Sequence, residues 1–411
     1  MGVLVALGLV TAGCGRGAGA TEARADVPRA STAGSSPTAA VGAIDAFGAD
    51  LYRSLANRSG NMVFSPYSVE IDLAMVRNGA NGQTRSQMDT VSRAGSGDDL
   101  DKSFNLLDQE LSARPGNKGD KNRSGDVELA MANALWGQKD STFEQPFLQV
   151  LAAQYGAGMK LEDYKTAAEA ARSDINAWAS DRTKGKIVDL LPKGSLDEMT
   201  RLVLTNAIYF KAPWVKKFSP SPGLAFTKAD GSAISVDGMT TSKIGAFGKG
   251  PGWTAGEIPY LGGELSMVVI MPDDLASFEK SLDGKTLGSI VGGLHGPLAT
   301  VQMPKFNFRT TASLKDELSS LGMPQAFTDQ ADFHGITTQE QLKISDVYHQ
   351  AFIAVDEEGT EAAAASAVVV EAVSGPVGET LTVDRPFLFA IRDVKTGTVL
   401  FLGRVVDPTA K

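Results

Sequence analysis

The chain has 411 residues, of which 43% are hydrophobic and 21% are charged, and its formal net charge is -9. This composition is typical of a soluble globular protein and excludes the disordered and fibrous classes. The acidic balance disfavours nucleic acid as a partner, because phosphate binding requires clusters of Lys and Arg. Cys14 is the single cysteine and there are 3 histidines. We therefore expect no intrachain disulfide, no metal site and no cofactor.

The first thirteen residues, MGVLVALGLVTAG, form an apolar run that is too short to span a bilayer and is typical of a secretion signal. The TAGC that ends at Cys14 resembles a bacterial lipobox, in which the cysteine is lipidated, although Thr11 replaces the usual Leu and no basic residue precedes the run. The alternative is a plain signal peptide with a chance cysteine. We predict a signal peptide over residues 1–14, a secreted protein, and a tether to the outer face of the cell membrane through lipidated Cys14.

Residues 15–40 consist of Gly, Ala, Ser, Thr and Pro with scattered charges. Such a segment cannot bury enough apolar area to fold, so it is interpreted as a flexible tether. From Val41 the pattern changes, and no second linker divides the rest. We therefore predict one large domain over residues 41–411.

Helices dominate the first part of this domain. AIDAFGADLYRSLA has apolar residues at helical spacing, which predicts an amphipathic helix. Ser65 and Pro66 follow a short apolar strand and open a second helix, since serine is a favourable cap and proline suits the first turn. AARSDINAWASDRTKG predicts a third helix that ends at Gly185.

Strands dominate the second part. TRLVLTNAIYFKAPW is a long apolar run that predicts a central strand. In LKISDVYHQAFIAVDEEG, residues Val347 to Val355 alternate so that His349 lies on the inward face. RPFLFAIRD and TVLFLGRVV form a hairpin with Gly397 in its loop. The chain is therefore predicted to be α+β with mostly antiparallel sheet.

The sequence contains no recognisable catalytic motif. There is no nucleophile elbow, no HExxH, no phosphate-binding loop and no dinucleotide fingerprint after a strand. His349 alone is more typical of a hydrogen-bonded core residue than of a general base. We therefore predict that the protein is not an enzyme and has no catalytic residues.

Several stretches together resemble the serpins, the serine protease inhibitor family, from Val41 to Pro408. They are VFSPYSV, NGANGQTRSQM, INAWASDRTKGKIVDLL, LVLTNAIYFKAPW, LGMPQAF, ADFHGI, HQAFIAVDEEGTEAAAA and RPFLFAIRDVKTGTVLFLGRVVDP. All eight occur in the family's order. The resemblance implies a fold of three β-sheets with eight or nine helices and an exposed reactive-centre loop, in a monomeric protein.

The resemblance also implies an irreversible suicide-substrate mechanism. A target protease attacks the loop and forms an acyl-enzyme, and the cleaved loop then inserts into the large sheet as a new strand and distorts the protease. Loop insertion of this kind is a form of strand addition, in which main-chain hydrogen bonds are gained and stored strain is released.

The resemblance assigns three groups of site residues. Ser65, Ser68, Asn206 and His349 match the shutter, a hydrogen-bonded cluster beneath the opening sheet. Trp214 matches the breach, where insertion starts. The loop hinge comprises Glu358, Gly359, Thr360, Glu361, Ala362, Ala363, Ala364 and Ala365.

The loop has the residues that a new central strand requires. Even-numbered positions from Thr360 to Val370 carry no charge, so that face can be buried, and both Glu361 and Glu371 lie on the other face. Within the loop no proline lies between Gly359 and Pro376, and Gly359 provides a flexible pivot.

The family's spacing from Gly359 places the reactive bond at Val373-Ser374. Counting back from Pro386 shifts it toward Ser374-Gly375 or Gly375-Pro376, and Ala372-Val373 is the other neighbour. Valine leaves the carboxylate of a trypsin-like pocket unpaired, so the expected partner is an elastase-like or subtilisin-like serine protease. The alternatives are a non-inhibitory serpin, an inhibitor of papain-like cysteine proteases and, most remotely, a hydrolase.

Overall fold

The structure is a computed structural model that describes residues 21–93, 99–114, 127–360 and 378–411. Several predicted site residues lie outside these ranges, namely Cys14, Glu361, Ala362, Ala363, Ala364, Ala365, Val373 and Ser374. None of the helices in the described part is long and apolar enough to cross a membrane.

Nine α-helices occur within the described residues, which agrees with the predicted eight or nine. They are α1 (Thr38–Leu55), α2 (Pro66–Arg77), α3 (Gly82–Val91), α4 (Asp99–Ala113), α5 (Gln145–Val150), α6 (Tyr164–Arg182), α7 (Leu275–Ser281), α8 (Gly284–Gly292) and α9 (Lys315–Leu321). A π-helical turn, η2 (Leu151–Tyr155), follows α5, and a 3-10 turn, η3 (Pro324–Phe327), follows α9.

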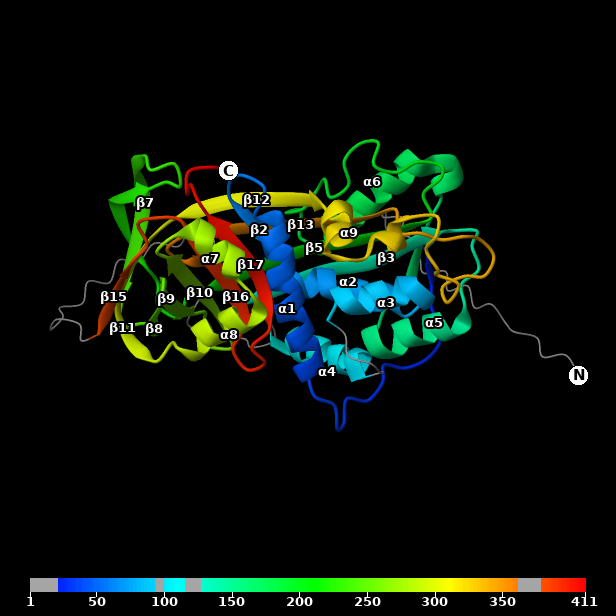
Figure 1. Cartoon of the computed structure of the whole chain (residues 1–411), viewed down its shortest axis with the longest axis horizontal. Coiled ribbons are helices and arrows are strands. Elements are labelled where there is room, and N and C mark those ends of the chain that lie inside the picture. Colours follow the sequence, from blue (N-terminus) through cyan, green and yellow to red (C-terminus); the bar gives the residue numbers. More distant parts are fainter. Residues whose placement is uncertain (1–20, 94–98, 115–126, 361–377) are drawn as a thin grey trace, which may run out of the picture.

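A seven-stranded sheet, called the large sheet here, crosses the molecule (Figure 1). Its strands in spatial order are β1 (Thr21–Ala23), β4 (Met159–Glu162), β3 (Glu128–Gln138), β5 (Leu202–Pro213), β14 (Gly359–Thr360), β13 (Asp346–Val355) and β12 (Phe306–Ser313). The predicted central strand is β5, which is buried along nearly its whole length. Helix α6 covers one face of this sheet, and α1 and α2 lie on the other side (Figure 1).

The remaining strands form a ten-stranded network. They are β2 (Met62–Phe64), β17 (Val399–Val405), β16 (Phe387–Asp393), β10 (Leu265–Pro272), β9 (Trp253–Pro259), β8 (Ala246–Gly250), β11 (Gly296–Pro304), β7 (Ala233–Ser242) and β6 (Ser219–Thr227), with β15 (Glu379–Thr382) beside β11. The start of β11 pairs with β8, whereas its later residues pair with β7 and β15. The second and third sheets that the resemblance implies are thus hydrogen-bonded to each other through β11.

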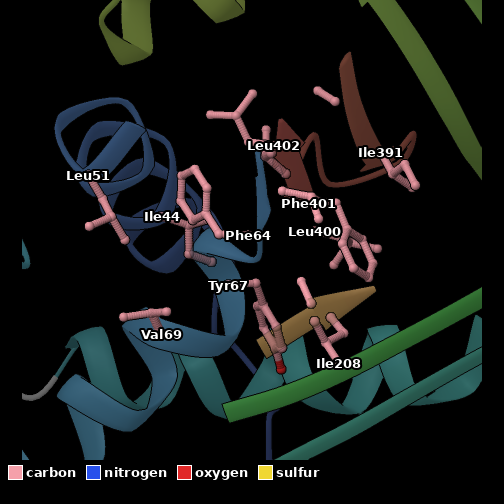
Figure 2. Packing of buried hydrophobic residues seen from close by; sticks show 14 of the residues in the cluster. Ile44, Leu51, Phe64, Tyr67, Val69, Ile208, Ile391, Leu400, Phe401 and Leu402 are labelled. Atoms are coloured by element: carbon pink, nitrogen blue, oxygen red, sulfur yellow. The ribbon is translucent and has the colours of Figure 1, made fainter. Parts of the chain in front are cut away.

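The main core lies between α1, α2 and the two sheets. Figure 2 shows Ile44 of α1 and Phe64 of β2 near Leu402 of β17, with Tyr67 of α2 directed toward Ile208 of β5. Helices α1 and α2 approach closely because Gly48 has no side chain, and a Cβ there would lie 2.8 Å from the ring of Pro66. Ser65 caps α2 as predicted, since its Oγ accepts a hydrogen bond from the Ser68 N–H at 3.1 Å.

The predicted tether over residues 15–40 is wrong from Thr21 onward. Strand β1 pairs antiparallel with β4, and Ala25 is buried in the core. The Arg29 guanidinium donates to Asn105 at 2.6 Å and forms an ion pair with Asp108 at 2.8 Å, both on α4. This N-terminal arm (residues 21–37) has little apolar surface of its own. The arm is ordered by contacts with β4 and α4, which its composition does not reveal. Helix α1 begins at Thr38, before the predicted domain start at Val41.

Candidate functional site

The candidate site is the seam between β5 and β13, the two adjacent parallel strands at the centre of the large sheet. They pair directly from Val203 and Asp346 to Ile208 and Ala351. Over this stretch each β13 residue pairs with the β5 residue 143 positions earlier, as His349 does with Asn206. The lower part of the seam is therefore closed by an uninterrupted ladder.

The upper part of the seam is already parted by β14. Thr360 pairs with Ala212 of β5 and with Val355 of β13, antiparallel to both. Val355 and Ala212 keep the same offset of 143 positions that holds in the closed part. The two strands are therefore separated sideways by β14, and their register relative to each other is the same as in the closed part.

Trp214 holds the chain that leads into β14. Its indole Nε1–H donates to the Asp356 carbonyl at 2.9 Å, and its backbone N–H donates to the Glu358 carbonyl at 2.9 Å. The indole is stacked on Tyr260 with ring centroids 4.5 Å apart, and the Tyr260 hydroxyl lies 2.6 Å from Thr360 Oγ1. The predicted breach residue is thus in direct contact with the hinge.

The chain that leads into the hinge makes a tight turn whose acidic side chains are hydrogen-bonded or form ion pairs. One Asp356 carboxylate oxygen accepts hydrogen bonds from the Glu358 and Gly359 N–H groups, and burial raises the pKa of this carboxyl. Glu357 forms an ion pair with Lys305 at 3.3 Å, and Glu358 forms one with Lys217. A Cβ on Gly359 would lie 2.1 Å from the Ala212 carbonyl oxygen, so glycine is required for this close approach.

Below the closed part of the seam, the predicted shutter residues come together. The Ser65 N–H donates to His349 Nε2 at 3.1 Å, and all four shutter residues are fully buried. Burial lowers the pKa of His349 to about 3, so this imidazole is neutral at physiological pH. Ser68 contributes its backbone N–H to the Ser65 hydroxyl, whereas its own hydroxyl has no partner among the described residues.

Asp72 is a member of this cluster that the sequence patterns did not single out. Its carboxyl group is fully buried and accepts a hydrogen bond from the Asn206 side-chain amide, and no cation neutralises it among the described residues. Burial raises the pKa of Asp72 well above its ordinary value, against the lowering effect of Asn206. The signal was available, because Ser65, Ser68 and Asp72 repeat at the three- and four-residue spacing of one helix face.

The shutter retains unused hydrogen-bonding capacity at the seam. Buried atoms without a partner in the described part of the chain are Ser68 Oγ, Asp72 Oδ1, Asn206 Oδ1 and His349 Nδ1. Buried polar atoms are almost always hydrogen-bonded in folded proteins, and leaving one unpaired costs roughly 1–3 kcal/mol. These four atoms are therefore hydrogen-bonding capacity that the described residues leave unused beside the seam.

Comparisons with known proteins agree with this geometry. The family model described as Serpin (serine protease inhibitor) matches residues 42–408. The chain belongs to the serpin family. An uncharacterized serpin-like protein of Thermococcus kodakarensis is 36% identical to it, covering 90% of this chain and 85% of the relative.

Two of its other serpin relatives carry the names of inhibitors. Human antithrombin-III is 35% identical over 89% of this chain and 81% of its own length, and leukocyte elastase inhibitor of Xenopus tropicalis is 35% identical over 88% and 97%. The native structure of the thermophilic serpin tengpin superposes with a TM-score of 0.78 at 28% identity, covering 89% of this chain and 94% of that one. The serpin fold and the family predicted from the sequence are confirmed.

Proposed function

We propose that this serpin is an irreversible, suicide-substrate inhibitor of a serine protease. The nucleophilic hydroxyl of the protease attacks the carbonyl carbon of Val373, the bond to Ser374 breaks, and the new amino terminus of Ser374 leaves. The loop remains joined to the protease by an ester. It then enters the seam from the hinge downward and becomes a full strand between β5 and β13.

One observation carries this proposal: the first two residues of that strand already lie between β5 and β13 in an antiparallel register with both. Because the offset between the flanking strands is the same above and below the parting point, insertion needs only lateral separation. The hydrogen bonds between β5 and β13 are then replaced by bonds to the new strand, so the backbone loses no partners on insertion.

The charges on the loop also fit this register. If the pairing of Thr360 with Ala212 is continued, Glu361 faces Lys211 and Glu371 faces Arg201, which directly precedes β5. Opposite charges on directly opposed residues stabilise a sheet. In the proposed inserted strand both glutamates would lie on the outer face, as the alternation of the sequence predicts.

The proposed target is an elastase-like or subtilisin-like protease, because Val373 suits a small apolar specificity pocket and no Lys or Arg lies between Glu357 and Asp384. We propose that the protein acts outside the cell as a monomer, held at the membrane through Cys14. These proposals rest on the sequence patterns of the signal segment and the loop.

The test is incubation of the protein with elastase, subtilisin, trypsin and a papain-like enzyme, followed by a denaturing gel and mass spectrometry of the released C-terminal peptide. We expect an SDS-resistant complex with elastase or subtilisin and a peptide that begins at Ser374. Trypsin complexes alone would overturn the target class, and a complex with the papain-like enzyme alone would identify a cross-class inhibitor.

A matched control separates inhibition from simple cleavage. In Thr360→Arg, a charged residue replaces the buried Thr360 at the parted end of the seam, where insertion would begin, so we expect cleavage at the same bond with at least a tenfold loss of complex. Cleavage of the wild-type protein with neither complex formation nor a rise in thermal stability would contradict the proposal and indicate a serpin that does not inhibit.

A further inference from the structure

We propose that a single proton controls how firmly α6 is held on the large sheet, and that Glu162, the last residue of β4, carries it. The neutral carboxyl group keeps α6 packed on the sheet, and the ionised group loosens it. This device acts in the uncleaved protein, and its effect on loop insertion rests on the proposed function.

Helix α6 packs on the strands that border the seam. Its apolar side chains form one cluster with residues from both sides of the seam: Ala171, Ile175 and Ala179 of α6, Val203 and Ala207 of β5, and Tyr348 of β13. The segment that follows α6 also reaches β13, because the Ser195 carbonyl accepts a hydrogen bond from the Tyr348 hydroxyl at 3.1 Å. Separation of β5 and β13 therefore disturbs the packing of α6.

The contact of α6 with β4 is polar, unlike its contact with β5. Lys160 and Glu162 alternate to the same face of β4. The Lys160 ammonium lies over the rings of Trp136 and Trp178, 5.8 and 5.6 Å from their centroids. Since Trp178 belongs to α6, this is the face that α6 covers. Glu162 is only 8% exposed there, and glutamates are rarely buried unless they are paired.

Glu162 has acidic neighbours and forms no ion pair within the described residues. Asp163 follows it in the chain, and the charge of Asp174 on α6 also acts on it. The nearby cations are committed elsewhere: Lys139, directly after β3, pairs with Asp163 at 2.9 Å, and Lys160 lies over the two tryptophan rings. An ionised Glu162 would therefore be a third negative charge in this place.

The strand on the other side of β4 does not supply a cation either. In β1, Glu22 stands opposite Lys160 in the register, and its carboxylate lies beside Gly158. The charged groups that bear on Glu162 from the described elements around it are thus acidic.

Two further polar groups at this contact have no partner among the described residues. They are the hydroxyl of Tyr164, a fully buried side chain in the first turn of α6, and the indole Nε1–H of Trp178. A buried polar group without a partner destabilises the contact that buries it. This end of the contact is therefore less firmly held than the apolar end and is the one that a charge can loosen.

A break in α6 separates the part that is fixed from the part that can lift. Ala167 has φ −146° and ψ 42°, which is outside the helical region. Before the break, the first turn is tied to β3, because Gln138 Oε1 accepts hydrogen bonds from two N–H groups of that turn at 3.0 and 3.3 Å. Asp174 lies beyond the break, so this longer part of α6 can respond to the charge on Glu162.

The direction of the pH dependence follows from the surroundings of Glu162. Burial, reinforced by the charges of Asp174 and Asp163, raises the pKa of Glu162 from 4.5 to about 7. Because the folded pKa lies above the ordinary one, the contribution of Glu162 to the attachment of α6 is fully present below about pH 4.5 and is lost as the pH rises through 7. A rise in pH therefore loosens α6.

Hydrogen exchange of the uncleaved protein at pH 6 and pH 8, corrected for the intrinsic exchange rate of each amide, tests this inference. Four proteins are compared: wild type, Glu162→Gln, Asp174→Asn and the control Glu169→Gln. Glu169 is an exposed residue of α6 that pairs with Arg172 at 2.8 Å, and this hydrogen-bonded arginine lowers the pKa of Glu169. The control therefore removes a carboxylate that stays ionised at both pH values.

In the wild type, protection of the amides in residues 168–182 should fall roughly three- to tenfold from pH 6 to pH 8. Glu162→Gln should keep its pH 6 protection at pH 8. Asp174→Asn should lose less than wild type, because removal of the neighbouring charge lowers the pKa of Glu162. Glu169→Gln should follow the wild type.

Three outcomes overturn the inference. Equal protection of wild-type α6 at both pH values would show that no proton controls it. The same loss in Glu162→Gln as in wild type would assign the titration to another group. If Glu162→Gln does not fold, Asp174→Asn decides, and a loss identical to that of wild type contradicts the role of Glu162.

A second measurement connects α6 to inhibition. At pH 8 the wild type should form more covalent complex per cleaved molecule than Glu162→Gln, and at pH 6 the two should agree. Comparison at one pH cancels the pH dependence of the protease itself. Equal yields at pH 8 would overturn the effect on insertion. Absence of complex from every variant would refute the proposed function, whereas the exchange result on the uncleaved protein would stand.

Discussion

The seam of the large sheet and the sheet formed by β10, β16 and β17 are both buried, but the groups that hold their strands together differ. Every residue of β10, β16 and β17 is buried, and the rings of Phe306, Phe308, Phe387 and Phe389 pack together beside β16. Charged groups there are paired: Asp393 with Arg114 at 2.7 Å, and Arg404 with Glu279 at 2.9 Å. At the seam, by contrast, Asp72 has no cation among the described residues.

The contrast distinguishes an apolar interface between strands from a polar one whose hydrogen bonds another strand can replace. Parting the apolar sheet would expose many aromatic and aliphatic groups at about 25 cal/mol per Å². Parting the seam exposes polar atoms that are already short of partners and backbone groups that a new strand can satisfy. In the proposed mechanism, the sheet that opens is therefore closed by hydrogen bonds that an inserted strand can replace.

Phe389→Ala should have the largest effect, because it removes a ring from the apolar packing around β16. The ring is fully buried between Phe306 and Phe308, so the cavity should lower the free energy of unfolding by about 3–5 kcal/mol. Chemical denaturation should show this loss before and after loop cleavage alike. Val394→Ala, at a side chain that is 40% exposed, is the control and should change stability by less than about 0.5 kcal/mol.

His349→Ala disrupts the shutter below the seam between β5 and β13. It leaves the Ser65 N–H unpaired and opens a cavity, so we expect a loss of about 2–4 kcal/mol and more latent or polymeric protein after mild heating. Native gels measure the loss of monomer. His349→Gln supplies an amide oxygen for the same N–H and should be milder. Unchanged monomer in the alanine variant would contradict the role of the shutter.

Asp72→Asn should strengthen the closed seam and change its pH dependence. The native pKa of Asp72 is raised above the unfolded value, so its contribution to stability is fully present below about pH 4 and is lost as the pH rises through the native pKa. Asparagine does not titrate and still accepts from Asn206. The variant should therefore gain on wild type as pH rises, by at least about 1 kcal/mol at pH 7.5.

His349 does not disturb that comparison. Its native pKa is lowered to about 3, so its contribution is present above about pH 6.5 and is lost as pH falls toward the native value. This contribution has the opposite sign and is common to both proteins, so it cancels in the difference. A difference that does not vary between pH 4 and pH 8 would show that Asp72 titrates normally.

Tyr260→Phe should have the smallest effect, because it removes one hydrogen bond from the parted end of the seam. Thr360 Oγ1 loses its partner, and the uncleaved protein should be less stable by about 1 kcal/mol. Thr360→Val removes the same bond from the other side. Denaturation of both single variants and the double variant gives the coupling energy, and additive losses would mean that the two hydroxyls do not interact.

Much of the seam could be predicted from residue patterns. The apolar run of β5, the alternation of β13 and the Ser65 cap are local signals, and the tertiary structure keeps them. The shutter and breach positions came from the resemblance to the family; the structure brings the shutter residues together and places Trp214 against the hinge. Their roles in loop insertion remain predictions.

Two features could not be predicted because their cause is not local. The arm over residues 21–37 has the composition of a linker and is held by the edge of β4 and by Asp108 of α4. The register of β14 depends on which β5 and β13 residues flank Thr360, and only the folded structure provides this. The reactive bond at Val373-Ser374 stays a prediction, since both residues lie outside the described ranges.

The N-terminal arm also bears on the orientation that the protein would have at a membrane if it were anchored through Cys14. Ala30 bonds Ala153 in η2, directly after α5, and in Figure 1 α5 lies at the opposite end of the molecule from β15, where the loop rejoins the sheet. Six residues separate Cys14 from Thr21, so a lipid anchor at Cys14 would be joined to the body by a connection of about 25 Å rather than a long spacer. If Cys14 is lipidated as proposed, a connection this short would hold the end of the molecule that carries α5 toward the bilayer and the end that carries β15 away from it.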